Sequence, residues 1–265
     1  MITAKTRLVA MIGQPIAQVK SPDYFNRAFA EAGAERAMIP MEIAPEAVAT
    51  FVETVRGWDN LDGFVVTIPH KQAIAELADE VSPRAKWLGA ANVVRREPDS
   101  RLVADMVDGL GYVAAIRANG FEPKGKHALV IGAGAAGSAI AHALCEEGVA
   151  ALAISELDWQ RGDRFADRLR EAFPSVEITT TCGDIGAYDL VANATPLGMR
   201  PNDPLPLGRL HIAALKETAL VTDAVTSPEV TPFLEAAKES GLKIQTGPEM
   251  SKAQMGLLGR HMGVL

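Results

Sequence analysis

Cysteine is scarce in this chain, with two residues among 265, and long apolar runs are missing. Neither Cys145 nor Cys182 belongs to a Cys-x-x-Cys or Cys/His pattern, so the sequence predicts no metal site. A disulfide between them stays open as an alternative, but two inert thiols in a cytoplasmic protein are the preferred interpretation. No stretch approaches the ~20 apolar residues of a membrane-spanning helix. Residues 1–13 also lack the features of a secretory signal peptide.

Runs of like charge are equally missing. The 26 basic and 33 acidic residues give a net charge of −7, without any basic cluster that would attract nucleic acid. Hydrophobic residues make up 48% of the chain and charged residues 22%, which is ordinary for a globular protein. We therefore expect a packed protein, monomeric or homodimeric, whose partner is a small molecule rather than a nucleic acid or a membrane.

Apolar runs alternate with helical patterns along the whole chain, which is typical of parallel βαβ units. Ser21 is predicted to cap the first helix, with Pro22 at its first position. A second unit is expected to begin near Gly109. The expected strands are 7–12, 37–43, 61–69, about 91–95, 127–134, 150–155, 176–180, 189–193 and 219–225. The expected helices start at Ser21, Pro45 and about Lys71, and then cover 109–119, 136–147, about 160–173 and about 251–261.

One of these predicted strands runs directly into a glycine turn and a predicted helix. Gly132, Gly134 and Gly137 have the Gly-x-Gly-x-x-Gly spacing of a dinucleotide-binding turn. The first glycine permits the turn, the second lets pyrophosphate approach the backbone, and the third allows close helix packing. A glycine turn needed only for packing is the weaker alternative. The predicted cofactor segment consists of Gly132, Ala133, Gly134, Ala135, Ala136 and Gly137.

An acidic residue follows the next predicted strand, close to the ~20-residue spacing at which a carboxylate meets the adenosine ribose. Glu156 at this position would accept hydrogen bonds from the ribose hydroxyls and repel a 2′-phosphate, so NAD is predicted over NADP. In the rival interpretation Glu156 is only a solvated charge, while Asp158 caps the next helix. The nearby Arg161 and Arg164 keep the binding of a 2′-phosphate, and therefore of NADP, open as an alternative.

Three polar segments follow predicted strands or open a new unit. Residues 67–71 (TIPHK) end a strand, where α/β proteins place ligands, Asn92 closes the next loop, and Asp108 precedes Gly109. A lysine beside an aspartate can deliver a proton to the oxyanion formed in hydride transfer. Taken by itself, Lys71 is more typical of a surface charge than of a catalytic residue.

Several ordered motifs together resemble the shikimate/quinate dehydrogenase family over nearly the whole chain. This chain has counterparts of six motifs of the family. In order, they are the N-terminal substrate motif, the catalytic lysine segment, two further motifs, the nicotinamide-side motif and a late Gly/Met/Gln pattern. They lie at residues 13–17, 20–22 and 26; 66–71; 89–92; 108–111; 193–199; and 247, 250 and 254.

The resemblance implies an α/β fold with an N-terminal α/β substrate domain and a Rossmann-type dinucleotide-binding domain, with a cleft between them. The substrate domain would span 1–108, completed by a C-terminal helix at 247–265, and the NAD-binding domain 109–246. Lys71 and Asp108 would be the catalytic pair. Substrate would also contact Ser21, Thr67, Asn92 and Gln254, and the cofactor would also contact Asn193, Thr195 and Met199. NADP-using members have Asn-Arg-Thr where this chain has residues 155–157 (SEL), which agrees with NAD.

Four departures from the family concern the substrate. Val19 and Thr226 stand where the family has a serine and a tyrosine that bind the substrate carboxylate, Val65 replaces an asparagine, and residues 106–107 (MV) replace an Asn-Thr pair. Each lost hydrogen bond to a charged group costs ~1–3 kcal/mol, so we expect shikimate to bind poorly. Ser21, a backbone amide or a shifted side chain could compensate.

The preferred hypothesis is an NAD-dependent oxidoreductase that interconverts a secondary alcohol and a ketone on a shikimate- or quinate-like ring. A non-catalytic sensor of NAD or of a ring metabolite is the alternative, and the retained Lys71 and Asp108 argue against it. A folate-linked dehydrogenase is disfavoured by the motifs at 108–111 and 193–199.

Overall fold

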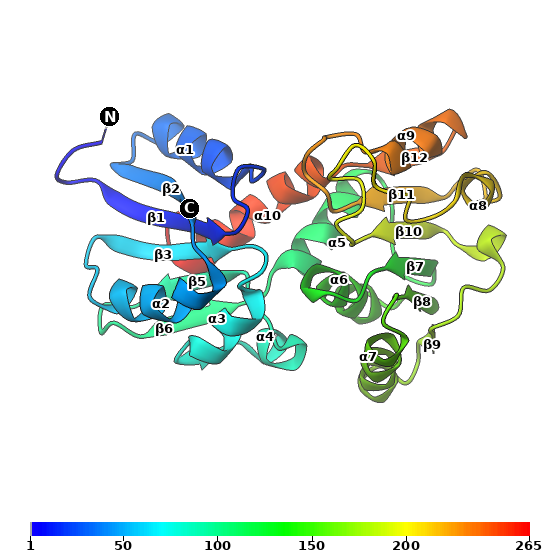
Figure 1. The fold of residues 1–265 in the computed structure, drawn as a ribbon, viewed down its shortest axis with the longest axis horizontal. Coiled ribbons are helices and arrows are strands. Elements are labelled where there is room, and N and C mark those ends of the chain that lie inside the picture. Colours follow the sequence, from blue (N-terminus) through cyan, green and yellow to red (C-terminus); the bar gives the residue numbers. More distant parts are fainter. Residues whose placement is uncertain (1) are drawn as a thin grey trace. The chain divides into compact units, whose positions relative to one another are not determined.

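The computed structural model describes residues 2–265, and the chain divides into two compact units (Figure 1). Unit 1 consists of the chain up to Val107 together with Gln254–Leu265, and unit 2 is Asp108–Ala253. Helix α10 (Gly247–Met262) therefore begins in unit 2 and ends in unit 1. Each unit is built on its own six-stranded sheet.

The sheet of unit 1 is mixed, with strand order β2-β1-β3-β5-β6-β4. Strand β1 pairs in parallel with β2 and β3, whereas β5 is antiparallel to both β3 and β6. The prediction of parallel units alone was therefore wrong here, because residues 97–101 are too short for a crossover and form a hairpin turn instead. The strands are β1 (Arg7–Gly13), β2 (Arg36–Glu42), β3 (Leu61–Val66), β4 (Glu80–Val81), β5 (Val93–Arg96) and β6 (Leu102–Asp105).

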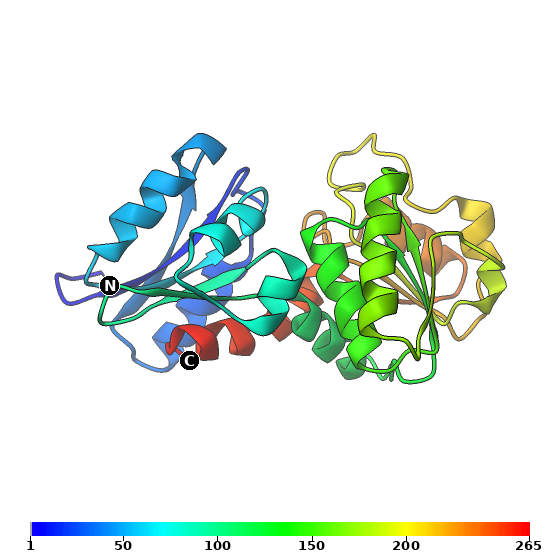
Figure 2. The same ribbon diagram turned by 90° about the horizontal axis from the view of Figure 1, so that it is seen from below.

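Helices cover both faces of this sheet (Figure 2). On one face, Val52 and Val55 pack in one apolar core with Phe64 and Ile74, while on the other Met262 of α10 lies against Gly63. Ser21 is the first residue of its helix and not its cap, because Lys20 occupies that position without a side-chain bond. The helical elements are α1 (Ser21–Glu31), the 3-10 turn η1 (Pro45–Ala47), α2 (Val48–Arg56), α3 (Lys71–Leu77) and α4 (Pro83–Leu88).

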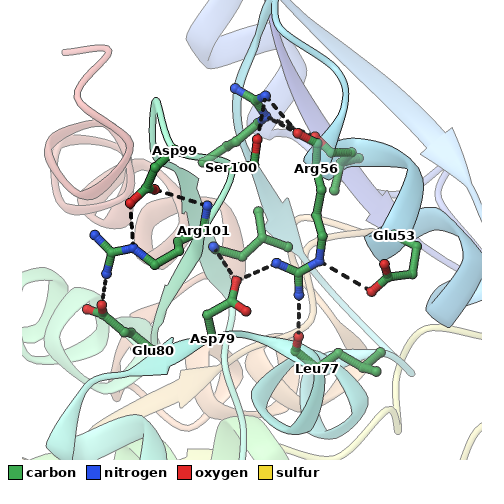
Figure 3. Close-up of polar contacts among 11 residues, drawn as sticks. Glu53, Arg56, Leu77, Asp79, Glu80, Asp99, Ser100 and Arg101 are labelled. Atoms are coloured by element: carbon green, nitrogen blue, oxygen red, sulfur yellow. Dashed lines mark hydrogen bonds and ion pairs between the residues drawn. The ribbon is translucent and has the colours of Figure 1, made fainter.

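An ion-pair network ties the two-residue edge strand β4 to its neighbours (Figure 3). Asp79 pairs with Arg56 of α2 and accepts a hydrogen bond of 2.7 Å from the backbone N–H of Leu102 on β6. The bond to Arg56, followed by the one to Leu102, lowers the pKa of Asp79. Arg101, just before β6, bridges Glu80 of β4 and Asp99. The network thus links the short edge strand to α2 and to the start of β6.

Unit 2 has a wholly parallel sheet with strand order β12-β11-β10-β7-β8-β9. The expected strands and helices of this unit are confirmed to within a few residues, but α8, α9 and β12 were not predicted. The strands are β7 (His127–Ile131), β8 (Ala151–Ser155), β9 (Glu177–Thr179), β10 (Leu190–Asn193), β11 (Leu220–Asp223) and β12 (Lys243–Gln245). The helical elements are α5 (Asp108–Ala118), α6 (Ala135–Glu146), α7 (Trp159–Ala172), η2 (Ile185–Ala187), α8 (Arg209–Ala213) and α9 (Pro232–Glu239).

Successive residues of β11 face opposite sides of the sheet and meet different helices. Val221 packs in a core with Phe233 and Leu234 of α9, whereas the next residue, Thr222, bonds the hydroxyl of Tyr112 on α5 at 2.8 Å. Burial raises the pKa of Tyr112, so its hydroxyl stays protonated. Helices α8 and α9 therefore cover one face of the sheet, and α5 lies on the other.

Both cysteines are thiols, as predicted. Cys145 is buried in α6, where burial raises its pKa to about 12, and Cys182 is exposed. Within residues 2–265, no helix has the combined length and hydrophobicity to cross a membrane.

A buried amide on β12 generates a stability prediction. Gln245 is fully buried, and within residues 2–265 neither its Nε2 nor its Oε1 has a hydrogen-bond partner. Its register partner is Thr222, so its side chain lies on the same face as Tyr112. Because a buried polar group without a partner costs ~1–3 kcal/mol, we expect Gln245→Met to raise the free energy of unfolding by about 1 kcal/mol. Urea unfolding measures this change.

The matched comparison is Thr222→Val, which removes the partner of Tyr112 instead. This variant should lower the free energy of unfolding by about 1 kcal/mol, because it strands a buried hydroxyl. A loss of stability in Gln245→Met would contradict the prediction and would mean that the amide is satisfied in solution.

Candidate active site and dinucleotide site

The glycine turn after β7 is shaped by close backbone packing. Gly132 has φ +95°, a conformation that favours glycine, and its N–H donates to the carbonyl of Ser155 at 2.8 Å. A Cβ on Gly137 would lie 1.9 Å from the carbonyl oxygen of Gly132, so the start of α6 packs directly on the turn. Gly134, at the N-cap, has no side chain to accept the first N–H groups of α6, which leaves them for an anion. These features fit the pyrophosphate of a dinucleotide.

Glu156 follows β8 and lies against the same turn. Its Oε2 accepts the N–H of Ala133 at 2.7 Å, and its Oε1 accepts the N–H of Asp158 at 3.1 Å and pairs with Arg161 at 2.8 Å. Only 6% of the Glu156 side chain is exposed. Burial raises its pKa, but these hydrogen bonds and the arginine outweigh burial, so the net shift is downward and the carboxylate is ionised at neutral pH.

The rival interpretation of this segment was half right. Asp158 does cap α7, because its Oδ1 accepts the N–H of Arg161 at 3.1 Å. Glu156, however, is a buried carboxylate with three partners and not a solvated charge. In dinucleotide-binding folds, an acidic residue after this strand hydrogen-bonds the adenosine ribose.

The segment after β10 is held by a buried amide. Asn193 accepts the N–H and hydroxyl of Thr195 at 3.0 and 2.7 Å, and its Nδ2 donates to Asp223 at 3.0 Å. The methyl of Thr195 lies 2.8 Å from the place that a Cβ on Gly132 would take, so this loop packs on the glycine turn. Met199 follows in the same loop and is half-buried. The predicted cofactor residues of unit 2 thus lie along the carboxyl ends of β7, β8 and β10.

Asp223 is a residue whose part in this site the sequence did not single out. Burial raises its pKa to about 6, while three donors favour its ionised form: the Thr231 hydroxyl, the Val225 N–H and the Asn193 amide. Asp223 therefore fixes the amide of Asn193, which in turn holds Thr195. The Asp-x-x-Thr-x-Pro pattern at residues 223–228 is the signal in the sequence that marks this position.

In unit 1, the segment 67–71 is anchored on both sides. The N–H of Thr67 donates to the carbonyl of Ile12 at 2.9 Å, and His70, which is 1% exposed, bonds the carbonyl of Ile43 through Nε2 at 2.7 Å. Lys71 begins α3 and is buried, with 9% of its surface exposed. Its carbonyl accepts the N–H of Ala91 at 2.8 Å. A buried lysine tethered in this way is not the surface charge of the alternative interpretation.

Asn92 links the same region to the end of β6. It is 2% exposed, its carbonyl accepts the N–H of Val66 at 2.8 Å, and its Oδ1 accepts the N–H of Val107 at 2.8 Å. Just before Val107, Asp105 accepts two bonds from Arg84, at 2.9 and 2.5 Å. Burial acts to raise the pKa of Asp105, but Arg84 and the other donors lower it overall. Thr67, Lys71 and Asn92 are therefore brought together at one end of the unit 1 sheet.

The remaining predicted residues are divided between the units. Asp108 is the first residue of α5, in unit 2, and is 4% exposed. Gln254 lies on the part of α10 that belongs to unit 1, and Ser21 starts α1 and is half-buried. Val19 is also half-buried, so its apolar side chain is not simply absorbed into the core.

Comparison with known proteins agrees with this architecture. Residues 11–94 match the model of the shikimate dehydrogenase substrate binding domain, and residues 114–197 match that of shikimate / quinate 5-dehydrogenase. The shikimate dehydrogenase (NADP(+)) of Rubrobacter xylanophilus is 36% identical over 253 residues, covering 94% of this chain and 88% of the relative. That of Citrifermentans bemidjiense is 34% identical over 261 residues, covering 96% and 88%.

Two solved structures show the same likeness. The shikimate 5-dehydrogenase of Thermus thermophilus, in complex with NADP(H) and shikimate, is 31% identical, with a TM-score of 0.87 over 98% of this chain and 94% of that chain. The quinate dehydrogenase of Corynebacterium glutamicum, in complex with NAD, is 26% identical, with a TM-score of 0.85 over 98% and 94%. The resemblance drawn from the sequence motifs is thereby confirmed, and the chain belongs to the shikimate/quinate dehydrogenase family.

Proposed function

We propose that this protein is a nicotinamide-dinucleotide-dependent oxidoreductase that interconverts a secondary alcohol and a ketone on a shikimate- or quinate-like ring. The observation that carries the proposal is the buried Lys71, tied to the Asn92 segment through the Ala91 N–H. Unit 2 supports it with a glycine turn and a helix start suited to a dinucleotide. In this proposal unit 1 binds substrate and unit 2 binds cofactor.

The proposed chemistry assigns the proton to Lys71. When bound, the dinucleotide supplies the acceptor or donor of the hydride. In oxidation the Lys71 amine takes the hydroxyl proton, and in reduction the ammonium returns it to the carbonyl oxygen. Asp108 is proposed as the second member of the catalytic pair, and Ser21, Thr67, Asn92 and Gln254 are proposed to orient the ring through its polar groups. Asp223 takes part indirectly, by holding Asn193 and Thr195 on the nicotinamide side.

Lys71→Ala tests this assignment. We expect turnover to fall by about 10²-fold or more, as for loss of a general acid–base group, while the dinucleotide binds as in the parent protein. Steady-state kinetics and calorimetric titration measure the two quantities. Near-normal turnover in this variant would remove Lys71 from the mechanism.

We propose further that the enzyme prefers NAD. The curated relatives named above are NADP(+) enzymes, so this preference distinguishes the chain from them. Its support is Glu156, whose buried and ionised carboxylate lies beside the glycine turn. A carboxylate there accepts the ribose hydroxyls and repels a 2′-phosphate.

The corresponding experiment compares kcat/KM for NAD and NADP. We expect NAD to be preferred and the preference to shrink in Glu156→Gln, which keeps the shape of the side chain but removes its charge. A tenfold or greater preference for NADP in the parent protein would refute this assignment.

The identity of the substrate is the most detailed part of the proposal. Val19 has no group that can donate a hydrogen bond to a carboxylate, and the hydroxyl of Thr226 is on a much shorter side chain than the tyrosine that it replaces. Shikimate should therefore have a high KM compared with a ring that lacks its carboxylate. A dehydrogenase screen with NAD against shikimate, quinate, aminoshikimate and related cyclitols tests this expectation. Efficient oxidation of shikimate would show that Ser21 or a backbone amide compensates. If the protein oxidised none of these compounds, the result would favour the alternative hypothesis of a non-catalytic sensor.

A further inference from the structure

The ion pair between Glu156 and Arg161 involves the oxygen that a ribose needs. A carboxylate offers about four acceptor positions, two on each oxygen. In Glu156, Oε2 uses one position for the Ala133 N–H, while Oε1 uses both, for the Asp158 N–H and for Arg161. A ribose diol that approaches both oxygens would therefore compete with Arg161 for Oε1.

The two partners of this ion pair differ in freedom. The Glu156 side chain is 6% exposed, whereas that of Arg161 is 51% exposed. A Cβ on Gly162 would lie 3.1 Å from Cβ of Glu156, so the first turn of α7 packs tightly on the stem of the glutamate. Glu156 is thus held by its surroundings, and Arg161 is the partner that can swing away into solvent.

Arg161 also changes the charge that a dinucleotide meets. A carboxylate rejects a 2′-phosphate by repulsion, and a guanidinium 2.8 Å from that carboxylate offsets the repulsion. The same guanidinium, once released, is a donor suited to phosphate oxygens. Arg161 therefore opposes Glu156 in both respects, because it competes with the ribose of NAD and tolerates the phosphate of NADP.

We propose that Arg161 is a second determinant of dinucleotide choice, which acts through its ion pair with Glu156 and weakens the discrimination against NADP. The inference rests on the proposed function, since it requires unit 2 to bind a dinucleotide. It assigns to the chain a graded preference for NAD, set by the balance between the carboxylate and the arginine.

The test measures dissociation constants of NAD and NADP by calorimetric titration, without substrate. In Arg161→Gln we expect NADP to bind more weakly and NAD equally well or better. The ratio of the dissociation constant of NADP to that of NAD should therefore rise about threefold or more, which is the size of effect expected from a half-exposed ion pair. Arg161→Lys, which keeps the charge, should restore most of the original ratio.

The matched control is Arg164→Gln, which removes the same charge from an exposed position three residues further along α7. It should change the ratio clearly less than Arg161→Gln does. A double-mutant cycle adds a stricter criterion. Because Arg161 competes with the ribose for the carboxylate, any gain in NAD binding from Arg161→Gln should disappear when Glu156 is already glutamine.

The outcomes separate the two proposals. If the parent protein binds neither dinucleotide, the proposed function is wrong. If it binds both, and Arg161→Gln leaves the ratio unchanged or lowers it, only the role of Arg161 is wrong. An equal change in Arg164→Gln would also overturn that role, since it would indicate a general effect of helix charge.

Discussion

In unit 2, the start of α6 lies so close to the turn after β7 that only a hydrogen atom fits between the Cα of Gly137 and the carbonyl oxygen of Gly132. This contact fixes the direction in which the first N–H groups of α6 point. It also brings the turn against Thr195 after β10 and leaves the Ala133 N–H to Glu156 after β8. Three strand ends are thereby joined into one surface, and the residues proposed to bind the dinucleotide all belong to it.

Unit 1 uses a different means to hold its polar residues in place. Lys71 and Asn92 are buried, and backbone hydrogen bonds tie their segments to each other and to the end of β6. Such bonds are directional and stay out of water, so they fix the backbone beneath a buried lysine without using its side chain. Preorganised in this way, the proposed proton donor loses little entropy when substrate binds.

Two carboxylates of the proposed dinucleotide site in unit 2 differ in their electrostatics. Glu156 is ionised because donors surround it, while Asp223, with three donors of its own, has a raised pKa because burial outweighs them. The first carboxylate can accept or repel a ligand, and the second mainly holds Asn193. Relatives of the family are named for NADP(+) or were solved with NAD, so the same fold accommodates either dinucleotide.

By itself, the sequence determined the features that depend on neighbouring residues: the strand–turn–helix around Gly132, the acidic residue after β8, and the motifs that identified the family. It also predicted most elements of unit 2, because strand and helix periodicities are local. Only the tertiary structure decided the antiparallel course of β5 and β6, the burial of Lys71, the role of Asp223 and the capture of Glu156 by Arg161. These features depend on which groups from distant parts of the chain come into contact and on how completely water is excluded from them. Local sequence patterns encode neither the long-range contacts nor the burial.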